Sequence, residues 1–173
     1  MDAESAATAP DGALWDEAVR EASAVLSSLR ERGQTLACAE SCTGGLIASA
    51  LTEVPGSSDC FKGGVVSYWA EVKNSLLGVP RDVIEKKGVV SSECARAMAE
   101  GASRLLSCEY ALSTTGIAGP GGDEPGKPVG TVWLGLSTPD GTCTELLHAE
   151  GDRGHVRLQA VVAALGMLAD ELS

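Results

Sequence analysis

The sequence predicts an α/β fold in which a mixed β-sheet lies between two layers of helices. Helical and strand-like patterns alternate along most of the chain, an order typical of a sheet with helices on both faces. Two strand-like segments then flank Pro139-Asp140-Gly141, a turn signal that indicates an antiparallel hairpin. The length of 173 residues suits one domain with one hydrophobic core.

The first half of the chain predicts six elements. Apolar residues at helical spacing predict a helix over 14–32, which Gly33 ends. A short apolar run then predicts a buried strand over 34–40, followed by a helix over 43–54 that Pro55 stops. The rest of this half predicts a strand over 61–69, one or two helical turns over 71–77 closed by Gly78, and a short helix over 81–87 ended by Gly88.

The second half predicts two further helices and three strands. A helix begins at Ser91 or Ser92, since a serine side chain accepts a hydrogen bond from a free N–H of the first turn. A strand over 110–115 follows, and the two strands of the hairpin cover 129–137 and 142–149. The last helix runs from about 153 to 172, and Asp152 has the character of its N-cap.

Composition and charge narrow the class of protein. Residues 1–12 are small, polar and acidic, so we expect a disordered tail ahead of one domain over 13–173. The formal net charge of −11 repels phosphate backbones, so we expect no nucleic-acid partner. We find no secretion signal and no apolar run of membrane-spanning length. We therefore expect no membrane contact and a cytoplasmic protein whose six cysteines are reduced.

The chain contains only two histidines, His148 and His155, and both lie far from the glycine-rich segments. A histidine-based catalytic triad or a multi-histidine metal site therefore has little material. If the protein is a hydrolase, we expect its base to be another residue type, and we expect no metal.

The segment Glu40-Ser41-Cys42-Thr43-Gly44-Gly45 is the first candidate for chemistry, because it joins a strand to a helix. Unpaired N–H groups at a helix N-terminus stabilise anions, and a hydroxyl at this turn can act as a nucleophile. Ser41 is then the nucleophile, with nearby N–H groups as an oxyanion site. The alternative is a helix cap by Ser41 or Thr43. Cys42 is the one thiol placed to act as a nucleophile instead.

Tyr68 and Lys73 form the second candidate, near the end of the strand over 61–69. A lysine acts as a base only when burial or its neighbours lower its pKa from ~10.4. Together with Tyr68, such a lysine could deprotonate a serine without a histidine. The alternative is a solvated lysine beside a half-buried tyrosine.

Residues 114–122 form a glycine-rich loop directly after a predicted strand. Loops of this kind present backbone N–H groups to anions, although no Gly-Lys-Ser/Thr follows as in a P-loop. The loop is therefore either a ligand contact or a flexible connection. Lys127 is either a cation for the ligand or solvated. Arg153, at the start of the last helix, could reach a phosphate.

In their order and spacing, these motifs resemble the CinA C-terminal domain family. The segments that carry the resemblance are AESCTGG, GVVS, TGIAGPGG, KPVGTVW and GDR, within a match from about Leu14 to Leu172. The resemblance implies a compact α/β/α amidohydrolase domain over 13–173, a homo-oligomer and no metal or organic cofactor. It also implies hydrolysis of nicotinamide mononucleotide to nicotinate mononucleotide and ammonia, a step of pyridine nucleotide salvage.

The resemblance further implies roles for individual residues. The family's serine, tyrosine and lysine fall on Ser41, Tyr68 and Lys73, so Ser41 would attack the carboxamide and Lys73 with Tyr68 would act as the base. N–H groups near 43–45 would stabilise the oxyanion, and the loop over 115–122 would hold phosphate or ribose. The expected substrate contacts are Cys42, Thr43, Gly44, Gly45, Thr115, Gly116, Gly119, Gly121 and Arg153.

Two departures and two alternatives accompany these expectations. Gly154 and His155 stand where acidic residues often follow GDR, and Trp69 and Ala70 stand where small polar residues are common. In one alternative, Ser41 positions a water molecule and no acyl-enzyme forms. In the other, the domain is a non-catalytic nucleotide-binding module that serves a protein partner in a competence or DNA-damage response.

Overall fold

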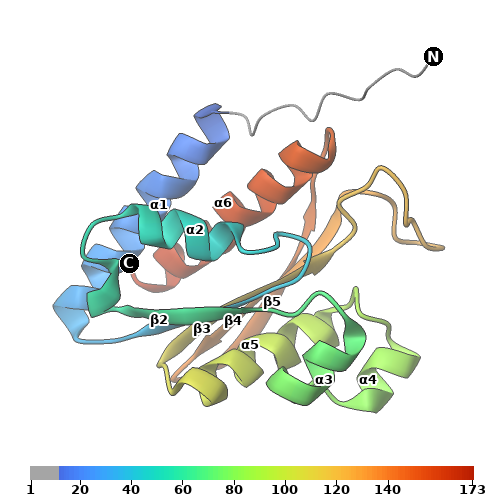
Figure 1. The fold of residues 1–173 in the computed structure, drawn as a ribbon, viewed down its shortest axis with the longest axis horizontal. Coiled ribbons are helices and arrows are strands. Elements are labelled where there is room, and N and C mark those ends of the chain that lie inside the picture. Colours follow the sequence, from blue (N-terminus) through green and yellow to red (C-terminus); the bar gives the residue numbers. More distant parts are fainter. Residues whose placement is uncertain (1–11) are drawn as a thin grey trace.

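The computed structural model describes residues 12–173 as a five-stranded sheet between two layers of helices (Figure 1). The predicted α/β class with a mixed sheet is confirmed. Residues 1–11 of the predicted tail lie outside the described residues, and Gly12 already belongs to the first helix.

Each predicted helix and strand is present, and one short 3₁₀ turn, η1, is added. None of the helices within residues 12–173 is both long and apolar enough to cross a lipid bilayer. In chain order the elements are α1 (Gly12–Arg32), β1 (Leu36–Glu40), α2 (Leu46–Glu53), η1 (Ser57–Asp59), β2 (Phe61–Val66), α3 (Ala70–Leu77), α4 (Arg81–Lys86), α5 (Ser92–Leu106), β3 (Tyr110–Gly116), β4 (Thr131–Thr138), β5 (Gly141–His148) and α6 (Arg153–Glu171).

The predicted bounds of α2 and β2 were wrong in ways that matter for the site. α2 begins at Leu46 rather than at 43, because Gly44 and Gly45 adopt φ angles of +61° and +101°, which a right-handed helix does not contain. β2 ends at Val66, so Tyr68 and Trp69 belong to the turn that leads into α3.

The sheet brings together strands that follow one another in the chain. The strand order is β2-β1-β3-β4-β5, with β2, β1 and β3 parallel and with antiparallel pairing from β3 to β4 and from β4 to β5. Glu40 lies in register with Val66 on one side and with Thr114 on the other. The carboxyl ends of three neighbouring strands therefore meet at one edge of the sheet.

Helices cover both faces of the sheet, and two cores fill the space between the layers. Figure 1 shows α1, α2 and α6 on one face and α3, α4 and α5 on the other. β1 is buried on both sides: Leu36 and Cys38 belong to the core beneath α1, α2 and α6, whereas Ala37 and Ala39 belong to the core beneath α5. This alternation directs the next side chain, that of Glu40, toward α2.

Gly101 and Gly166 offer a matched pair of helix substitutions. A Cβ atom on Gly101 in α5 would lie 2.1 Å from the Leu77 carbonyl oxygen of α3, whereas one on Gly166 in α6 would meet nothing within 4 Å. We expect Gly101→Ala to lower the free energy of unfolding by about 2 kcal/mol, because overpacking outweighs the gain in helix propensity. Gly166→Ala should leave it unchanged or raise it by up to ~1 kcal/mol. Urea denaturation checks both values, and equal stabilities would contradict the close packing of α3 on α5.

Candidate active site

The carboxylate of Glu40 fixes the turn between β1 and α2. Its side chain is 1% exposed. Oε2 accepts hydrogen bonds from the Thr43 hydroxyl at 2.6 Å and from the N–H groups of Gly45 at 3.0 Å and Ile47 at 3.1 Å; Oε1 accepts from the Ala48 N–H at 2.9 Å. A carboxylate is well placed there, because the first N–H groups of a helix lack intrahelical partners and carry a partial positive charge.

The same turn is also tied to β3. The Ser41 N–H donates to the Thr114 carbonyl oxygen at 3.0 Å, and the hydroxyls of Thr43 and Thr114 lie 2.8 Å apart. The Gly44 N–H donates to the Ser41 carbonyl oxygen at 3.1 Å. Ser41 therefore starts a turn that is held from both sides.

These bonds change which N–H groups of the turn are available to a ligand. The predicted donors near 43–45 include Gly44 and Gly45, whose N–H groups are already bonded to Ser41 and Glu40. Within residues 12–173, the N–H groups of Cys42 and Thr43 have no acceptor on another residue. The candidate oxyanion donors are therefore the N–H groups of Cys42 and Thr43, closer to Ser41 than predicted.

Lys73 of α3 lies directly against Ser41. Its side chain is fully buried, with 1% exposure for the residue, and Nζ donates to Ser41 Oγ at 2.8 Å. Nζ also donates to the carbonyl oxygen of Ser67, the residue that follows β2. The structure thus joins the predicted nucleophile and the predicted base, which are 32 residues apart in the chain.

The surroundings of Lys73 favour its neutral form. Burial lowers the pKa of the amine, because removal from water disfavours the charged form. Thiolates at Cys94 and Cys42 would oppose this effect, but burial raises the pKa of each thiol to about 11, so both stay uncharged at neutral pH. No carboxylate forms an ion pair with Lys73 in the described part of the chain.

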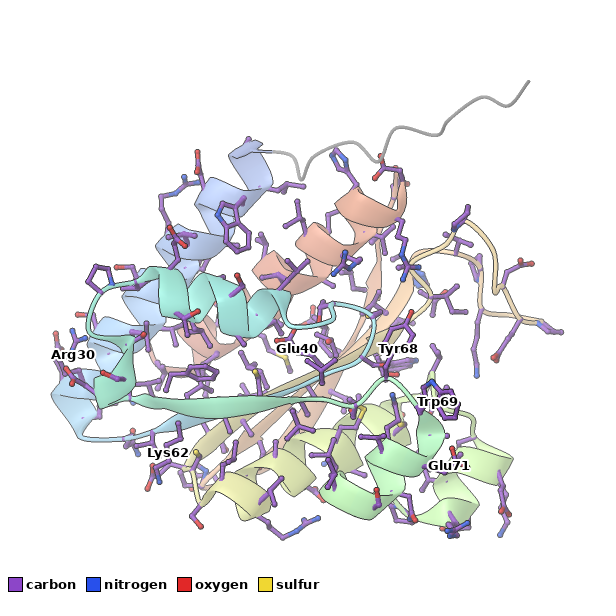
Figure 2. All side chains as sticks on the ribbon, viewed as in Figure 1. Arg30, Glu40, Lys62, Tyr68, Trp69 and Glu71 are labelled. Atoms are coloured by element: carbon purple, nitrogen blue, oxygen red, sulfur yellow. The ribbon has the colours of Figure 1, made fainter. Side chains whose placement is uncertain are left out.

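Tyr68 does not lie with this serine–lysine pair. It is 58% exposed, and its hydroxyl accepts a hydrogen bond from Arg153 Nη2 at 3.1 Å. Arg153 Nη1 donates to the Gly119 carbonyl oxygen at 2.7 Å, so Arg153 joins the turn after β2 to the glycine-rich loop. Figure 2 shows Tyr68 and Trp69 together where β2 gives way to α3, and Trp69 is 70% exposed. Both aromatic rings are therefore at the rim of the site.

The structure divides the predicted contacts of the glycine-rich loop. The Thr115 hydroxyl donates to the Val89 carbonyl oxygen at 2.6 Å, and Gly116 packs so closely on β4 that a Cβ atom would lie 2.6 Å from the Thr131 carbonyl oxygen. These two residues build the fold. Gly119 contacts Arg153, and Gly121 has open space around it. Within the loop, the part near 119–121 is therefore the part open to a ligand.

The amine of Lys127 is bonded to neighbouring residues, and the described part of the chain holds no metal-binding cluster. Its amine lies 3.2 Å from Glu124 Oε2 and donates to the Lys87 carbonyl oxygen at 3.3 Å. Among residues 12–173, no group of three histidine, cysteine, aspartate or glutamate side chains is arranged to hold a metal ion.

Arg157 was missed in the sequence and contacts the serine turn. Its Nε donates to the Cys42 carbonyl oxygen at 3.1 Å and its Nη2 to that of Thr43 at 2.8 Å. The available signal was its spacing of four residues from Arg153, which places both on one helix face. The partial positive charge of a helix N-terminus repels a cation, so an arginine in the first turns of a helix suggests that its guanidinium bonds a group outside that helix.

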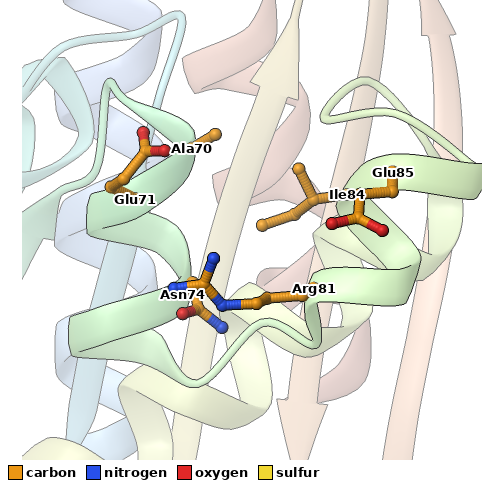
Figure 3. Close-up of a pocket in the computed structure, with 6 residues that line it drawn as sticks. All are labelled: Ala70, Glu71, Asn74, Arg81, Ile84 and Glu85. Carbon is orange, nitrogen blue, oxygen red and sulfur yellow. The ribbon is translucent and has the colours of Figure 1, made fainter.

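A groove lies between α3 and α4. It has a volume of about 170 Å³, and Arg81 reaches across it toward α3 (Figure 3). Its lining residues are Ala70, Glu71, Asn74, Arg81, Ile84 and Glu85. None of the predicted site residues lines it.

The fold and the site define an open α/β/α domain in which a buried lysine contacts a half-buried serine at the carboxyl ends of the parallel strands. The family model for the CinA C-terminal domain matches residues 19–172. The chain belongs to this family, as the motifs of the sequence suggest.

Relatives with known sequences and structures agree with this assignment. CinA-like proteins of Frankia casuarinae and Myxococcus xanthus are each 51% identical, over 83% and 87% of this chain. The chain spans 33% and 36% of the length of these two relatives. The crystal structure of competence/damage inducible protein CihA from Agrobacterium tumefaciens matches with a TM-score of 0.86 and 37% identity, over 90% of this chain and 95% of that one. A competence-damaged protein (CinA) superfamily protein from Enterobacter cloacae matches with a TM-score of 0.87 and 29% identity, over 90% and 92% of the two chains.

The substitution Glu40→Gln tests how strongly the turn depends on a carboxylate. The amide keeps the shape but replaces one acceptor by an NH₂ group that faces N–H donors, so we expect the free energy of unfolding to fall by about 2–4 kcal/mol. The matched control is Glu109→Gln, since the exposed Glu109 carboxylate accepts from the Thr35 N–H at 2.8 Å and from its hydroxyl at 2.6 Å. The control should lose less than about 1 kcal/mol. Chemical denaturation measures both, and similar losses would show that burial of Glu40 is unimportant.

Proposed function

We propose that this domain is an amidohydrolase that converts nicotinamide mononucleotide to nicotinate mononucleotide and ammonia. The observation that carries the proposal is the hydrogen bond of 2.8 Å between Ser41 Oγ and the fully buried amine of Lys73, which forms no ion pair with a carboxylate among residues 12–173. A lysine with a lowered pKa can remove a proton from serine, a task that often falls to histidine. The substrate itself is inferred from the family resemblance.

In the first half of the reaction, neutral Lys73 accepts the hydroxyl proton of Ser41 while Oγ attacks the carboxamide carbon. The carbonyl oxygen becomes an oxyanion, and the N–H groups of Cys42 and Thr43 are the donors available to stabilise it. Lys73 then donates its proton to the amide nitrogen. The C–N bond breaks, ammonia leaves, and an ester joins Ser41 to the nicotinate group.

In the second half, water replaces the nucleotide on Ser41. Lys73 accepts a proton from water as its oxygen attacks the ester carbon, and it returns that proton to Ser41 Oγ when the C–O bond breaks. The products are the regenerated serine and a carboxylic acid, which gives its proton to the released ammonia and becomes a carboxylate. The sum is one amide and one water consumed and one carboxylate and one ammonium ion formed, so no cofactor is required.

Arg153 is the residue that we assign to the substrate phosphate. Its guanidinium lies at the rim between Tyr68 and Gly119, and an arginine presents several N–H donors in a geometry that matches phosphate oxygens. Tyr68 then acts as a substrate contact at the rim rather than as part of the base. The homo-oligomeric state and the cytoplasmic location stay predictions of the resemblance and of the composition.

The competing proposal is a non-catalytic nucleotide-binding module in a competence or DNA-damage response. The competence and damage names of structural relatives favour it. A binding module has no need for a buried lysine against a serine, however, because burial of an amine without a counter-ion costs stability. The contact between Lys73 and Ser41 therefore favours catalysis.

Ammonia release from nicotinamide mononucleotide tests the two proposals. We expect the purified protein to release ammonia, and we expect Ser41→Ala and Lys73→Met each to lower the rate by at least about 10³-fold with the fold intact. Lys62→Met is the matched control, because this exposed lysine of β2 bonds the Ser107 carbonyl oxygen and neither Ser41 nor Lys73. Circular dichroism verifies folding. Stabilisation of the protein by the nucleotide without any ammonia release would support the binding module instead.

Rapid quenching with labelled substrate distinguishes the nucleophile from the alternative in which Ser41 positions water. We expect a covalent adduct on Ser41 in the wild type and none in Ser41→Ala. Turnover without any adduct at early times would show that no acyl-enzyme forms.

The dependence of kcat/KM on pH reports the protonation state of Lys73. Because the reaction needs the neutral amine and burial lowers its pKa, the rate should rise with pH, with a midpoint below 10.5. Lys73→Arg should lack activity across this range, since the guanidinium group of an arginine stays protonated up to pH ~12. A midpoint at or above 10.5 would contradict the role of Lys73 as a base with a lowered pKa.

A further inference from the structure

Arg157 is a cation that no step above uses, yet it bonds the turn that carries Ser41. Its two hydrogen bonds go to the consecutive carbonyl oxygens of Cys42 and Thr43, which lie more than a hundred residues earlier in the chain. No carboxylate forms an ion pair with Arg157 within residues 12–173. Its charge is therefore directed at the serine turn and is not neutralised by an acidic side chain.

The planarity of the peptide bond gives these contacts a consequence for the N–H groups. In a trans peptide the C=O and N–H bonds point in opposite directions. Because the Cys42 carbonyl points toward Arg157 in α6, the Thr43 N–H of the same peptide points away from α6. This N–H is one of the two donors of the turn that have no acceptor on another residue of the described chain.

The second carbonyl extends this effect to the peptide next to Ser41. The Thr43 carbonyl is held by Arg157, and the N–H of the same peptide, that of Gly44, donates to the Ser41 carbonyl oxygen at 3.1 Å. The Ser41 carbonyl shares its peptide with the Cys42 N–H, the second donor without an acceptor on another described residue. Arg157 therefore fixes, directly or through one peptide, the orientation of both N–H groups.

Gly44 permits the close approach of the guanidinium. A Cβ atom on Gly44 would lie 3.3 Å from Arg157 Nη2, and the φ angle of +61° at Gly44 disfavours other residues. The charge also reaches the turn: burial raises the pKa of Cys42, and Arg157 acts in the opposite direction. A hydrogen bond to a carbonyl also polarises the peptide, which strengthens its N–H as a donor.

We infer that Arg157 is a positioning residue for the hydrolysis: its guanidinium holds the Cys42 and Thr43 carbonyls so that the N–H groups of the turn stabilise the oxyanion formed when Ser41 attacks. The inference rests on the proposed function for its substrate. It adds a requirement for two parallel N–H donors at this position, which a lysine does not supply.

The test compares Arg157→Met and Arg157→Lys with the control Arg32→Met. Arg32 also donates to a backbone carbonyl, that of Leu172, but away from Ser41. We expect Arg157→Met to lower kcat by about 10²-fold with KM nearly unchanged, the pattern of a lost transition-state interaction. Arg157→Lys should recover little of this loss, and Arg32→Met should keep the wild-type kcat. Added guanidinium ion, well below denaturing concentration, should partly restore kcat in Arg157→Ala.

A second measurement does not depend on the substrate. A fluorophosphonate that labels reactive serines needs the same nucleophile and the same stabilisation of a developing oxyanion. Ser41 should therefore be labelled more slowly in Arg157→Met and Arg157→Lys than in the wild type. Folded Arg157 variants with wild-type kcat and labelling rate would overturn the inference, as would a loss confined to KM. If labelling slows but nicotinamide mononucleotide is not hydrolysed by the wild type, only the proposed substrate fails. If wild-type Ser41 is not labelled at all, the nucleophile and the inference fail together.

Discussion

The buried carboxylate of Glu40 is the interaction on which the arrangement of the site depends. A charge in the interior is costly unless several donors surround it, and here three N–H groups and the Thr43 hydroxyl do so. The bonds to Glu40 fix the first turn of α2 and leave the N–H of Gly45 unavailable to a ligand. They also hold the hydroxyl of Thr43, which lies against that of Thr114 in β3. Ser41 follows directly in the chain, so its position is set by its neighbour.

Lys73 presents the opposite electrostatic situation within the same few residues. Glu40 is surrounded by donors, whereas the amine of Lys73 bonds Ser41 and the Ser67 carbonyl oxygen and forms no ion pair with a carboxylate in residues 12–173. Because burial lowers its pKa, the unfolded chain binds a proton more readily than the folded one between the folded pKa and 10.5. Stability therefore rises with pH across that window. The burial that weakens the fold below this window is also what makes the amine a base.

Local sequence patterns predicted the fold well. They did not predict which side chains of the site contact one another, because those contacts join distant segments. The sequence patterns identified each α-helix and β-strand of residues 12–173 but not the 3₁₀ turn η1, and Ser41 and Lys73 were chosen from their residue types and the family resemblance. Thr115 was predicted to contact the substrate, and no sequence pattern indicated that its hydroxyl bonds the Val89 carbonyl oxygen in the segment between α4 and α5. Tyr68 meets Arg153 rather than Lys73, because β2 ends before the tyrosine. No local pattern specifies such partners, since each depends on how two layers pack.

Strand direction explains why residues so far apart in sequence meet at one edge. β1, β2 and β3 are parallel, and two antiparallel steps through β4 return β5 to the direction of β3. Four strands therefore end at the same edge, and each is followed by a segment of the site: Ser41 after β1, Ser67 and Tyr68 after β2, the loop containing Gly119 after β3, and α6 with its two arginines after β5. The hairpin of β4 and β5 contributes no residue to the serine–lysine pair. It does place the N-terminal end of α6 at the edge where open α/β sheets bind their ligands. An even number of reversals after β3 is what lets Arg153 and Arg157 reach the turns after β1 and β2.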